Sequence, residues 1–412
     1  MTEGPYRLFE VCGLELEYPI VDSELHVQPL VEPAFRLLAG RPTSDVAGPR
    51  FGFSNELADH VFELKNPRPL PSLVTAEADL VAGVTLFSNL LREHFGARLL
   101  PGGMHPFMDP RLGRTWRRAN RRVYEAYAAV FDLSTHGWMN VQSCHVNLPF
   151  GTERETLVML DATACLLPYL PALSASSPVH DGELGPFVDN RLAFYRTHQA
   201  RVPQTQGRVV PEHVGSFAEY KRDVLGGIYR ALREIPEAAP LRREFCNARG
   251  AILRFVRQAM EIRVLDVQEC PRADMAIAAL VFAVLRELVA RHGARLPDFA
   301  RRSTTRARKA QLLACARHGL DAPLRLDDVR EAFALPAGVR TARGFWRHMH
   351  RRFVPGALVA AHDAAIATIL RRGNLADRLL ACHERRGRSR AGFAPLLRAL
   401  ADCLAQNRML GA

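Results

Sequence analysis

Two short segments near the N-terminus alternate apolar residues with carboxylates. In residues 13–18, Glu15 and Glu17 are separated and flanked by leucine and tyrosine. In residues 60–64, Glu63 stands between phenylalanine and leucine. Alternation of this kind is typical of a β-strand with one apolar and one polar face. The polar faces of both predicted strands therefore carry groups that can bind a metal ion or move a proton.

Two later segments show the same alternation with other reactive side chains. In residues 141–147, His145 lies on the face opposite cysteine and valine. In residues 260–264, Glu261 and Arg263 share a face opposite isoleucine and valine. The four predicted strands together offer carboxylates, an imidazole and a guanidinium group.

Each segment alone is typical of the solvated face of a half-exposed sheet, and a lone histidine is usually a structural residue. Their joint occurrence predicts a site. If the polar faces line one cavity, the carboxylates repel one another unless cations neutralise them. Magnesium suits such a site because it takes oxygen ligands and keeps positions for water and substrate phosphates, with Arg263 at the phosphate end. The carboxylates are those of Glu15, Glu17, Glu56, Glu63 and Glu261.

The elements that must position these residues differ along the chain. Up to about residue 270, short alternating segments mix with helices at irregular spacing, which lacks the β-α-β rhythm of a parallel sheet and predicts an antiparallel one. Beyond that point nearly every segment has helical periodicity. We expect a catalytic region, 1–295, and a helical region, 296–412, packed on it as one integrated domain. The predicted helices are 272–293, 296–319, 327–335, 344–385 with breaks at Pro355 and Gly373, and 391–410.

Composition excludes several classes of protein. The chain has 412 residues, 48% of them apolar and 24% charged, as in an ordinary globular protein. Its longest apolar run, residues 275–285, is too short to span a bilayer. The N-terminus shows no secretory signal, and the eight cysteines are scattered without metal-ligand spacing. We expect a cytoplasmic protein with reduced, mostly buried cysteines and no membrane association.

The net charge of +12 comes from the helical region. Residues 296–412 hold 22 basic and 9 acidic residues, whereas the rest of the chain holds 33 and 34. Almost all of the positive charge is arginine. Solvated helix faces are the default interpretation. The alternative is a nucleic-acid-binding module with arginine-rich helices at 301–317, 343–352 and 385–390. Against it, the aromatic residues at 345–346 have the spacing of a packed helix.

Five motifs in order resemble the type-2 glutamate–cysteine ligase family, also called carboxylate–amine ligases, of the glutamine synthetase-like superfamily. The first is Gly13-x-Glu15-x-Glu17. The resemblance extends over roughly residues 8–320. The other motifs are Gly102-Gly103-Met104-His105-Pro106-Phe107, His145-Val146-Asn147, Leu173-Ser174-Ala175-Ser176-Ser177-Pro178 and Glu261-Ile262-Arg263-Val264-Leu265-Asp266.

The resemblance implies an α+β fold in which a curved antiparallel sheet forms a half-barrel with helices outside. It implies ATP with two or three Mg²⁺ ions, for which Mn²⁺ is a possible substitute. The γ-phosphate would pass to a substrate carboxylate, and an amine would then displace phosphate to form an amide of the γ-glutamyl type. No phosphate-binding glycine loop and no nucleophile elbow compete with this interpretation. A phosphotransferase of the same superfamily, without amide formation, remains an alternative.

The resemblance also assigns roles residue by residue. Metal binding falls to Glu15, Glu17, Glu56, Glu63, His145 and Glu261, and Glu261 and Arg263 are the catalytic pair. Arg263 and Arg254 would bind ATP. The substrate-binding candidates are Arg196, His105, Gln142 and Ser176. For Arg196 an ion pair with Asp189 or a neighbouring glutamate is the structural alternative.

The sequence departs from the family pattern at positions outside the acidic set. Many relatives have His-Val-His-Val-Gly where this chain has residues 143–147, Ser-Cys-His-Val-Asn. Many have an aromatic-rich segment where this chain has Val179-His180-Asp181. We therefore expect small-molecule carboxylate and amine substrates other than glutamate plus cysteine as the best pair. Whether the enzyme is a homodimer stays open.

Overall fold

The structure is a computed structural model that describes residues 5–386 and 390–411. At its centre the described residues form an eight-stranded sheet in which every pairing is antiparallel. In pairing order the strands are β2 (Asp45–Ala47), β3 (Gly52–Asn55), β4 (Val61–Lys65), β1 (Gly13–Val21), β6 (Ser143–Pro149), β10 (Ala259–Asp266) and β9 (Ala251–Arg254), and β5 (Arg98–Leu99) pairs with β1. A separate hairpin joins β7 (Val179–His180) to β8 (Glu183–Leu184).

The predicted antiparallel sheet is confirmed. The four strands predicted from the alternating segments are β1, β4, β6 and β10, which stand side by side in the order β4-β1-β6-β10. The sheet stays open, because the pairing runs from β2 at one edge to β9 at the other. The strands that carry the reactive side chains therefore form its middle.

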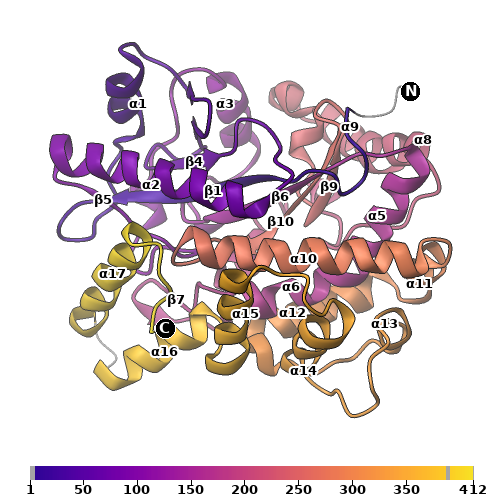
Figure 1. Cartoon of the computed structure of the whole chain (residues 1–412). Coiled ribbons are helices and arrows are strands. Elements are labelled where there is room, and N and C mark those ends of the chain that lie inside the picture. The colour runs from indigo at the N-terminus through magenta and orange to yellow at the C-terminus, as the bar shows by residue number, and fades with distance from the viewer. Residues whose placement is uncertain (1–4, 387–389, 412) are drawn as a thin grey trace.

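The apolar face of this sheet packs against two long helices, α2 (Leu73–Phe95) and α10 (Pro271–His292) (Figure 1). Phe62 of β4 stacks on Phe87 of α2 with ring centroids 4.1 Å apart. At Gly83 the helix approaches so closely that a Cβ would press on the end of the Leu64 side chain. Burial of this face explains the strict alternation in the strands.

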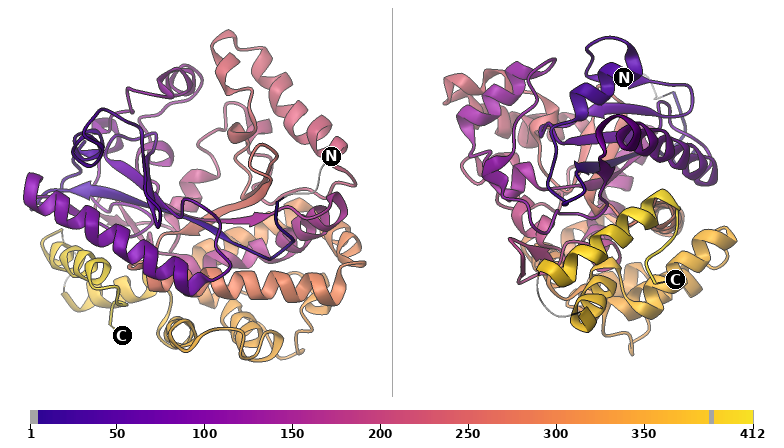
Figure 2. Two further views of the ribbon diagram at one scale, coloured as in Figure 1. Left: turned by 45° about the horizontal axis from the view of Figure 1, so that its top comes forward. Right: turned by 90° about the vertical axis from the view of Figure 1, so that its left-hand side faces the viewer.

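The shorter α-helices before α10 lie on both faces of the sheet, since some share the apolar core and others carry residues of the polar face. The two views of Figure 2 show α10 and the C-terminal helices gathered on one side of the sheet. The α-helices before α10 are α1 (Val31–Ala39), α3 (Arg121–Val130), α4 (His136–Met139), α5 (Glu153–Leu166), α6 (Leu170–Ser174), α7 (Asn190–Tyr195), α8 (Phe217–Glu219) and α9 (Gly226–Arg233). Single-turn or irregular segments are η1 (Pro110–Leu112), η2 (Leu167–Tyr169), η3 (Pro203–Thr205), η4 (Tyr220–Leu225), η5 (Pro236–Leu241) and η6 (Glu244–Cys246).

The rest of the chain is helical, as predicted, but one predicted helix is wrong in its extent. The segment 296–319 is two helices, because Ser303 is extended and the Thr304 hydroxyl accepts from Ala307 N at 3.1 Å to cap a new helix. The elements after α10 are α11 (Leu296–Arg302), α12 (Thr305–His318), η7 (Gly319–Asp321), α13 (Asp327–Ala332), α14 (Ala342–His348), η8 (Met349–Phe353), α15 (Ala360–Arg372), α16 (Leu375–Arg386) and α17 (Arg390–Ala405).

A continuous apolar core joins these helices to the sheet region. Trp346 is fully buried and donates from Nε1 to Tyr169 O at 3.0 Å. Phe345 stacks on Tyr169 with ring centroids 4.4 Å apart. These aromatic rings are therefore inaccessible to nucleic-acid bases. Of the arginine-rich segment 385–390, residues 387–389 and the neighbouring side chains lie outside the described residues.

Two helical stretches are long and apolar enough to cross a membrane by length and composition alone. In residues 153–174, 94% of the apolar window is buried inside the fold, which marks a core helix; in α2 the corresponding share is 33%, on the side that faces the sheet. The eight cysteines are buried, apart from the half-buried Cys382. The predicted burial of the cysteines is thus confirmed for most of them.

Candidate active site

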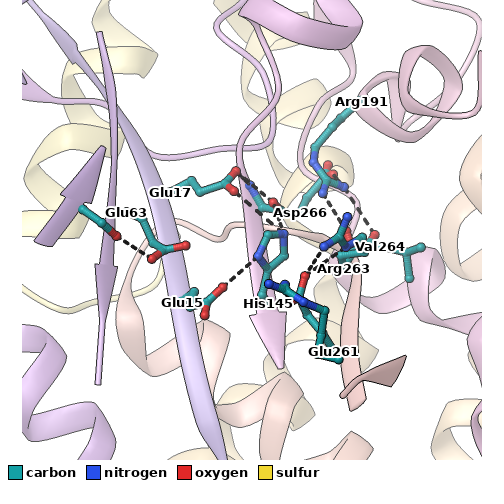
Figure 3. Close-up of polar contacts among 12 residues, drawn as sticks. Glu15, Glu17, Glu63, His145, Arg191, Glu261, Arg263, Val264 and Asp266 are labelled. Carbon is teal, nitrogen blue, oxygen red and sulfur yellow. Dashed lines mark hydrogen bonds and ion pairs between the residues drawn. The ribbon is translucent and has the colours of Figure 1, made fainter. Parts of the chain in front are cut away.

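The polar face of the sheet carries the predicted site, opposite α2 and α10 (Figure 3). In the register of the strands, Glu15 lies beside His145 and Glu17 lies beside Glu63. Glu261 reaches the same face from β10. Because side chains alternate between the two faces of a strand, the apolar residues between these groups fill the core beneath.

These side chains line one cavity of about 420 Å³, an ordinary size for a small-molecule site. Glu56 joins them from the turn between β3 and β4. Among the described residues, all that line the cavity precede residue 264, so the described part of the helical C-terminal region contributes none of them. The cavity brings together every residue predicted to bind metal or nucleotide: Glu15, Glu17, Glu56, Glu63, His145, Arg254, Glu261 and Arg263.

His145 contacts the first acidic pair through both ring nitrogens. Its Nδ1 lies 3.1 Å from Glu15 Oε2, and its Nε2 lies 2.8 Å from Ser143 Oγ. The Ser143 hydroxyl donates to Glu17 Oε2 at 2.8 Å, so it accepts from His145. Both ring nitrogens are then donors, as in the protonated imidazolium. Although burial alone lowers the pKa of His145, the hydrogen bond to Glu15 and the charges of Glu17 and Glu261 raise it overall.

Three arginines neutralise carboxylates in the same cavity. Arg263 donates to Glu261 Oε1 through Nε at 3.0 Å and also through Nη2, and Arg254 Nη1 donates to Glu261 Oε2 at 2.5 Å. From the turn between β9 and β10, Arg257 Nη1 donates to Glu15 Oε1 at 3.1 Å. Burial alone raises the pKa of Glu261, but Arg263 and Arg254 bring it well below its usual range. Three guanidinium groups thus stand where they can bind phosphate oxygens.

Glu56 and Glu63 lie among other carboxylates and are less well neutralised. Burial and the charges of Glu17, Glu63 and Glu15 raise the pKa of Glu56 well above its usual range. Burial and the charge of Glu15 raise the pKa of Glu63 to about 7, although Lys65 opposes this shift. A cation among these groups would relieve the repulsion between them.

The donor set fits a divalent cation. Glu15, Glu63 and His145 each present one ligand atom, and these atoms lie within 4.8 Å of one another. Carboxylate oxygens suit Mg²⁺ and Mn²⁺, which keep coordination positions for water and substrate oxygens. The residues present therefore fit the metal that the sequence predicts.

Three residues predicted to contact substrate lie behind the cavity and are at most 2% exposed. His105 Nε2 lies 2.8 Å from Leu25 O, and Ser176 Oγ accepts from Gly103 N at 2.8 Å. The backbone N of Gln142 donates to Gly103 O at 2.9 Å. These hydrogen bonds hold the loops beneath the sheet, so direct contact with a ligand in the cavity is not the role that the geometry supports.

Arg196 also lies outside the cavity, and it follows Tyr195 as the C-terminal cap of α7. Burial and the Arg196 charge lower the pKa of Lys309, so this guanidinium lies near another cation. Among the described residues no ion pair joins Arg196 to Asp189, which instead caps α7. Arg191, earlier on the same helix, lines the cavity.

Two kinds of cavity-lining residue were not predicted from the sequence. Arg191 and Arg257 lie in the cavity, and the Arg254-x-x-Arg257 spacing across a predicted turn was the available signal for one of them. Aromatic residues also line it, and on helices these were indistinguishable from core residues. They are Tyr124 and Tyr127 of α3, Trp138 of α4, Tyr195 of α7 and Phe245 of η6.

A second group of potential metal ligands, His136, His180 and Asp181, lies outside the cavity. Asn140 Nδ2 donates to His136 Nδ1 at 3.1 Å, while its Oδ1 accepts from His105 N at 2.7 Å, which fixes the amide orientation. The proton of neutral His136 is then on Nε2, which donates to Asp181 Oδ1 at 3.0 Å. That nitrogen is not available to a metal ion.

Comparisons with known proteins agree with this geometry. The chain is 38% identical to an uncharacterized protein of Archaeoglobus fulgidus over 67% of this chain and 74% of that protein. It is 29% identical to a Paracoccus denitrificans protein, itself only provisionally named glutamate–cysteine ligase 2, over 70% of this chain and 69% of that protein.

A solved structure shares the fold. The glutamate–cysteine ligase of Francisella tularensis, in complex with AMP, matches with a TM-score of 0.60 and 12% identity, over 98% of this chain and 90% of that chain. The predicted glutamine synthetase-like fold is thereby confirmed. The model of glutamate–cysteine ligase family 2 matches residues 11–394. The chain therefore belongs to glutamate–cysteine ligase family 2.

Proposed function

We propose that the protein is an ATP-dependent ligase that joins a small carboxylate substrate to an amine through an acyl phosphate. One observation carries this proposal: a single cavity combines an acidic set that fits divalent cations with three arginines that pair with glutamates of that set. Family membership supports it, and the structurally similar Francisella ligase contains AMP.

The metal ions would be held by Glu15, Glu17, Glu63, His145 and Glu261, with Glu56 beside them. Bound Mg²⁺ supplies positive charge that neutralises the nucleotide phosphates. His145 must give up a proton to become a ligand, since both of its nitrogens are donors in this structure. The Ser143 hydroxyl, which also contacts Glu17, orients the imidazole.

The arginines are placed to act on the phosphoryl group in transfer. In the first step the bond between the γ-phosphorus and its bridging oxygen breaks, and a carboxylate oxygen of the substrate bonds to that phosphorus. Arg263, Arg254 and Arg257 would stabilise the charge on the transferring oxygens, which requires them to leave their carboxylate partners.

In the second step the amine nitrogen attacks the carbonyl carbon of the acyl phosphate. The carbon–oxygen bond to phosphate breaks, the amine loses a proton, and the products are an amide and inorganic phosphate. Enclosure by Tyr124, Tyr127 and Trp138 would limit water, which competes with the amine.

Product analysis tests the proposal. Purified protein with ATP, Mg²⁺ and panels of carboxylic acids and amines is expected to yield ADP, phosphate and an amide detectable by mass spectrometry. A carboxylate labelled with ¹⁸O is expected to transfer one labelled oxygen to phosphate. Formation of AMP and pyrophosphate would contradict the acyl-phosphate route. A phosphorylated product whose formation no amine alters would instead identify a phosphotransferase.

A further inference from the structure

Strand β10 is irregular at the residue that matters most for the proposed chemistry. Its pairing with β6 is regular up to Ile262 opposite Val146 and resumes at Leu265 opposite Cys144. Arg263 and Val264 together therefore face the single residue His145, which is the arrangement of a β-bulge. A bulge turns side chains and leaves backbone groups without ladder partners.

Arg191 of α7 takes up the carbonyl groups at this bulge (Figure 3). Its Nη2 donates to Arg263 O at 2.8 Å, and its Nη1 lies 3.5 Å from Val264 O and 3.3 Å from Asp266 Oδ1. The residue is 2% exposed. One planar guanidinium group thus reaches two successive carbonyls and a carboxylate, which a lysine ammonium on a flexible stem cannot reproduce.

A second layer of hydrogen bonds holds Arg191 in place. Asp266 Oδ2 accepts from Ser176 N at 2.9 Å and from Ser177 Oγ at 2.8 Å. Ser177 Oγ also accepts from the backbone N of Arg191 at 3.1 Å. Gly103 lies against the Asp266 carboxylate, where any side chain would collide with it. The Ser-Ser-Pro and Gly-Gly motifs of the sequence thus meet at Asp266.

We propose that Arg191 is a positioning residue, which holds the β10 bulge so that the Arg263 guanidinium stays beside Glu261 in the cavity. The expected effect of Arg191 on kcat rests on the proposed function. Its role in holding the β10 bulge rests on its hydrogen bonds to Arg263 O, Val264 O and Asp266. It also gives Ser176 and Ser177 a role behind the cavity, as the residues that orient Asp266 against Arg191.

The test compares two buried arginines. Arg191→Lys keeps the charge but loses the two-carbonyl contact. The matched control is Arg378→Lys, since Arg378 is also buried, pairs with Glu269 and donates to Leu410 O, yet lies outside the cavity. In the whole, metal-free protein, amide hydrogen exchange of residues 259–267 is expected to accelerate in Arg191→Lys and to stay unchanged in Arg378→Lys.

The kinetic result is expected to follow the same pattern. Arg191→Lys should lower kcat on the order of 100-fold, because a small displacement of a catalytic group is enough for such a loss, with the KM for ATP little changed. Ser177→Ala, a milder change to the same network, should show both effects in smaller degree and keeps the test available if Arg191→Lys fails to fold.

Three outcomes would overturn the proposal. The first is unchanged amide hydrogen exchange in residues 259–267 of both Arg191→Lys and Ser177→Ala. The second is an equal change in exchange and kcat in Arg191→Lys and Arg378→Lys. The third is a rise in a substrate KM of Arg191→Lys at unchanged kcat, which would make Arg191 a substrate contact. If the wild-type protein forms no amide, the exchange measurement still decides the positioning role. Active enzyme with unaltered exchange would refute positioning while leaving the ligase proposal intact.

Discussion

Within the cavity, the two glutamates Glu63 on β4 and Glu261 on β10 are expected to affect stability in opposite directions. Glu63 lies close to other carboxylates, and its pKa is raised to about 7. Glu261 pairs with Arg263 and Arg254, and its pKa is lowered. The same Glu→Gln substitution therefore removes an unfavourable charge at one position and a favourable one at the other.

Glu63→Gln is expected to stabilise the metal-free protein above neutral pH. Because the folded protein holds the Glu63 proton up to about pH 7 while the unfolded chain releases it near its ordinary pKa, stability falls as pH rises between these values. The variant lacks this fall. Thermal unfolding in EDTA should show a higher Tm than wild type at pH 8 and little difference at pH 5. An equal shift at both pH values would contradict the argument.

Glu261→Gln is expected to destabilise the metal-free protein by about 3 kcal/mol, the usual cost of leaving buried charge unpaired. If the carboxylates of the cavity only repelled one another, removal of one would leave the stability of the metal-free protein intact. The arginines are the reason for the difference. Urea denaturation at pH 8 measures the loss in the free energy of unfolding. Glu63→Gln is the control, for which the free energy of unfolding is expected to rise. The Glu261 contribution should fade as pH falls below about 4.5, where the unfolded carboxylate takes up its proton.

Among the elements, a side-chain cap marks the break between α11 and α12. The helical periodicity runs on through 296–319, so the pattern of apolar residues alone could not reveal the break. Thr304 caps α12 through its hydroxyl. The strands could be predicted from the sequence more accurately than this helix break, because each predicted strand buries one face and a shift of one residue would expose that face.

Thr304→Ala is expected to lower the free energy of unfolding by about 1 kcal/mol through loss of the cap. The neighbouring Thr305→Ala, which removes a hydroxyl that does not cap the helix, serves as the control and should cost less. Chemical denaturation of both variants checks this. Similar losses in the two would show that α12 does not depend on the Thr304 hydroxyl.

Across the whole molecule, the arginine-rich helices and the sheet region share one core. Trp346 lies in that core against Tyr169, which follows α5 in the region before residue 295. Since one continuous apolar core contains both these aromatic residues and the buried face of the sheet, the sheet region and the helical region should unfold together.

Trp346→Ala is expected to cost about 3–5 kcal/mol, as for other large buried residues, and to keep a single transition. Within each protein, wild type or variant, far-UV circular dichroism and tryptophan fluorescence should report one shared midpoint, and the midpoint of the variant should be lower. Val359→Ala, at an exposed apolar residue of the same region, is the control, with an expected effect within about 0.5 kcal/mol. Separate midpoints for the two probes would indicate that the helical region unfolds by itself.

The sequence by itself determined the antiparallel strands, the face on which the reactive residues lie and the set of acidic residues. These features follow from local alternation and from the order of the motifs, which can be recognised without knowing which distant residues are in contact. Glu15, His145 and Glu261 could be assigned to one site because alternating strands place side chains of equal parity on one face.

Only the tertiary structure decided which arginines enter the cavity and which motifs stand behind it. Arg191 lines the cavity and Arg196 does not, because side chains five residues apart on a helical segment point to different sides. Ser176 and His105 belong to conspicuous motifs, yet their partners are backbone groups and carboxylates brought from far along the chain. Such pairings depend on how elements pack in space, which a pattern of neighbouring residues does not encode.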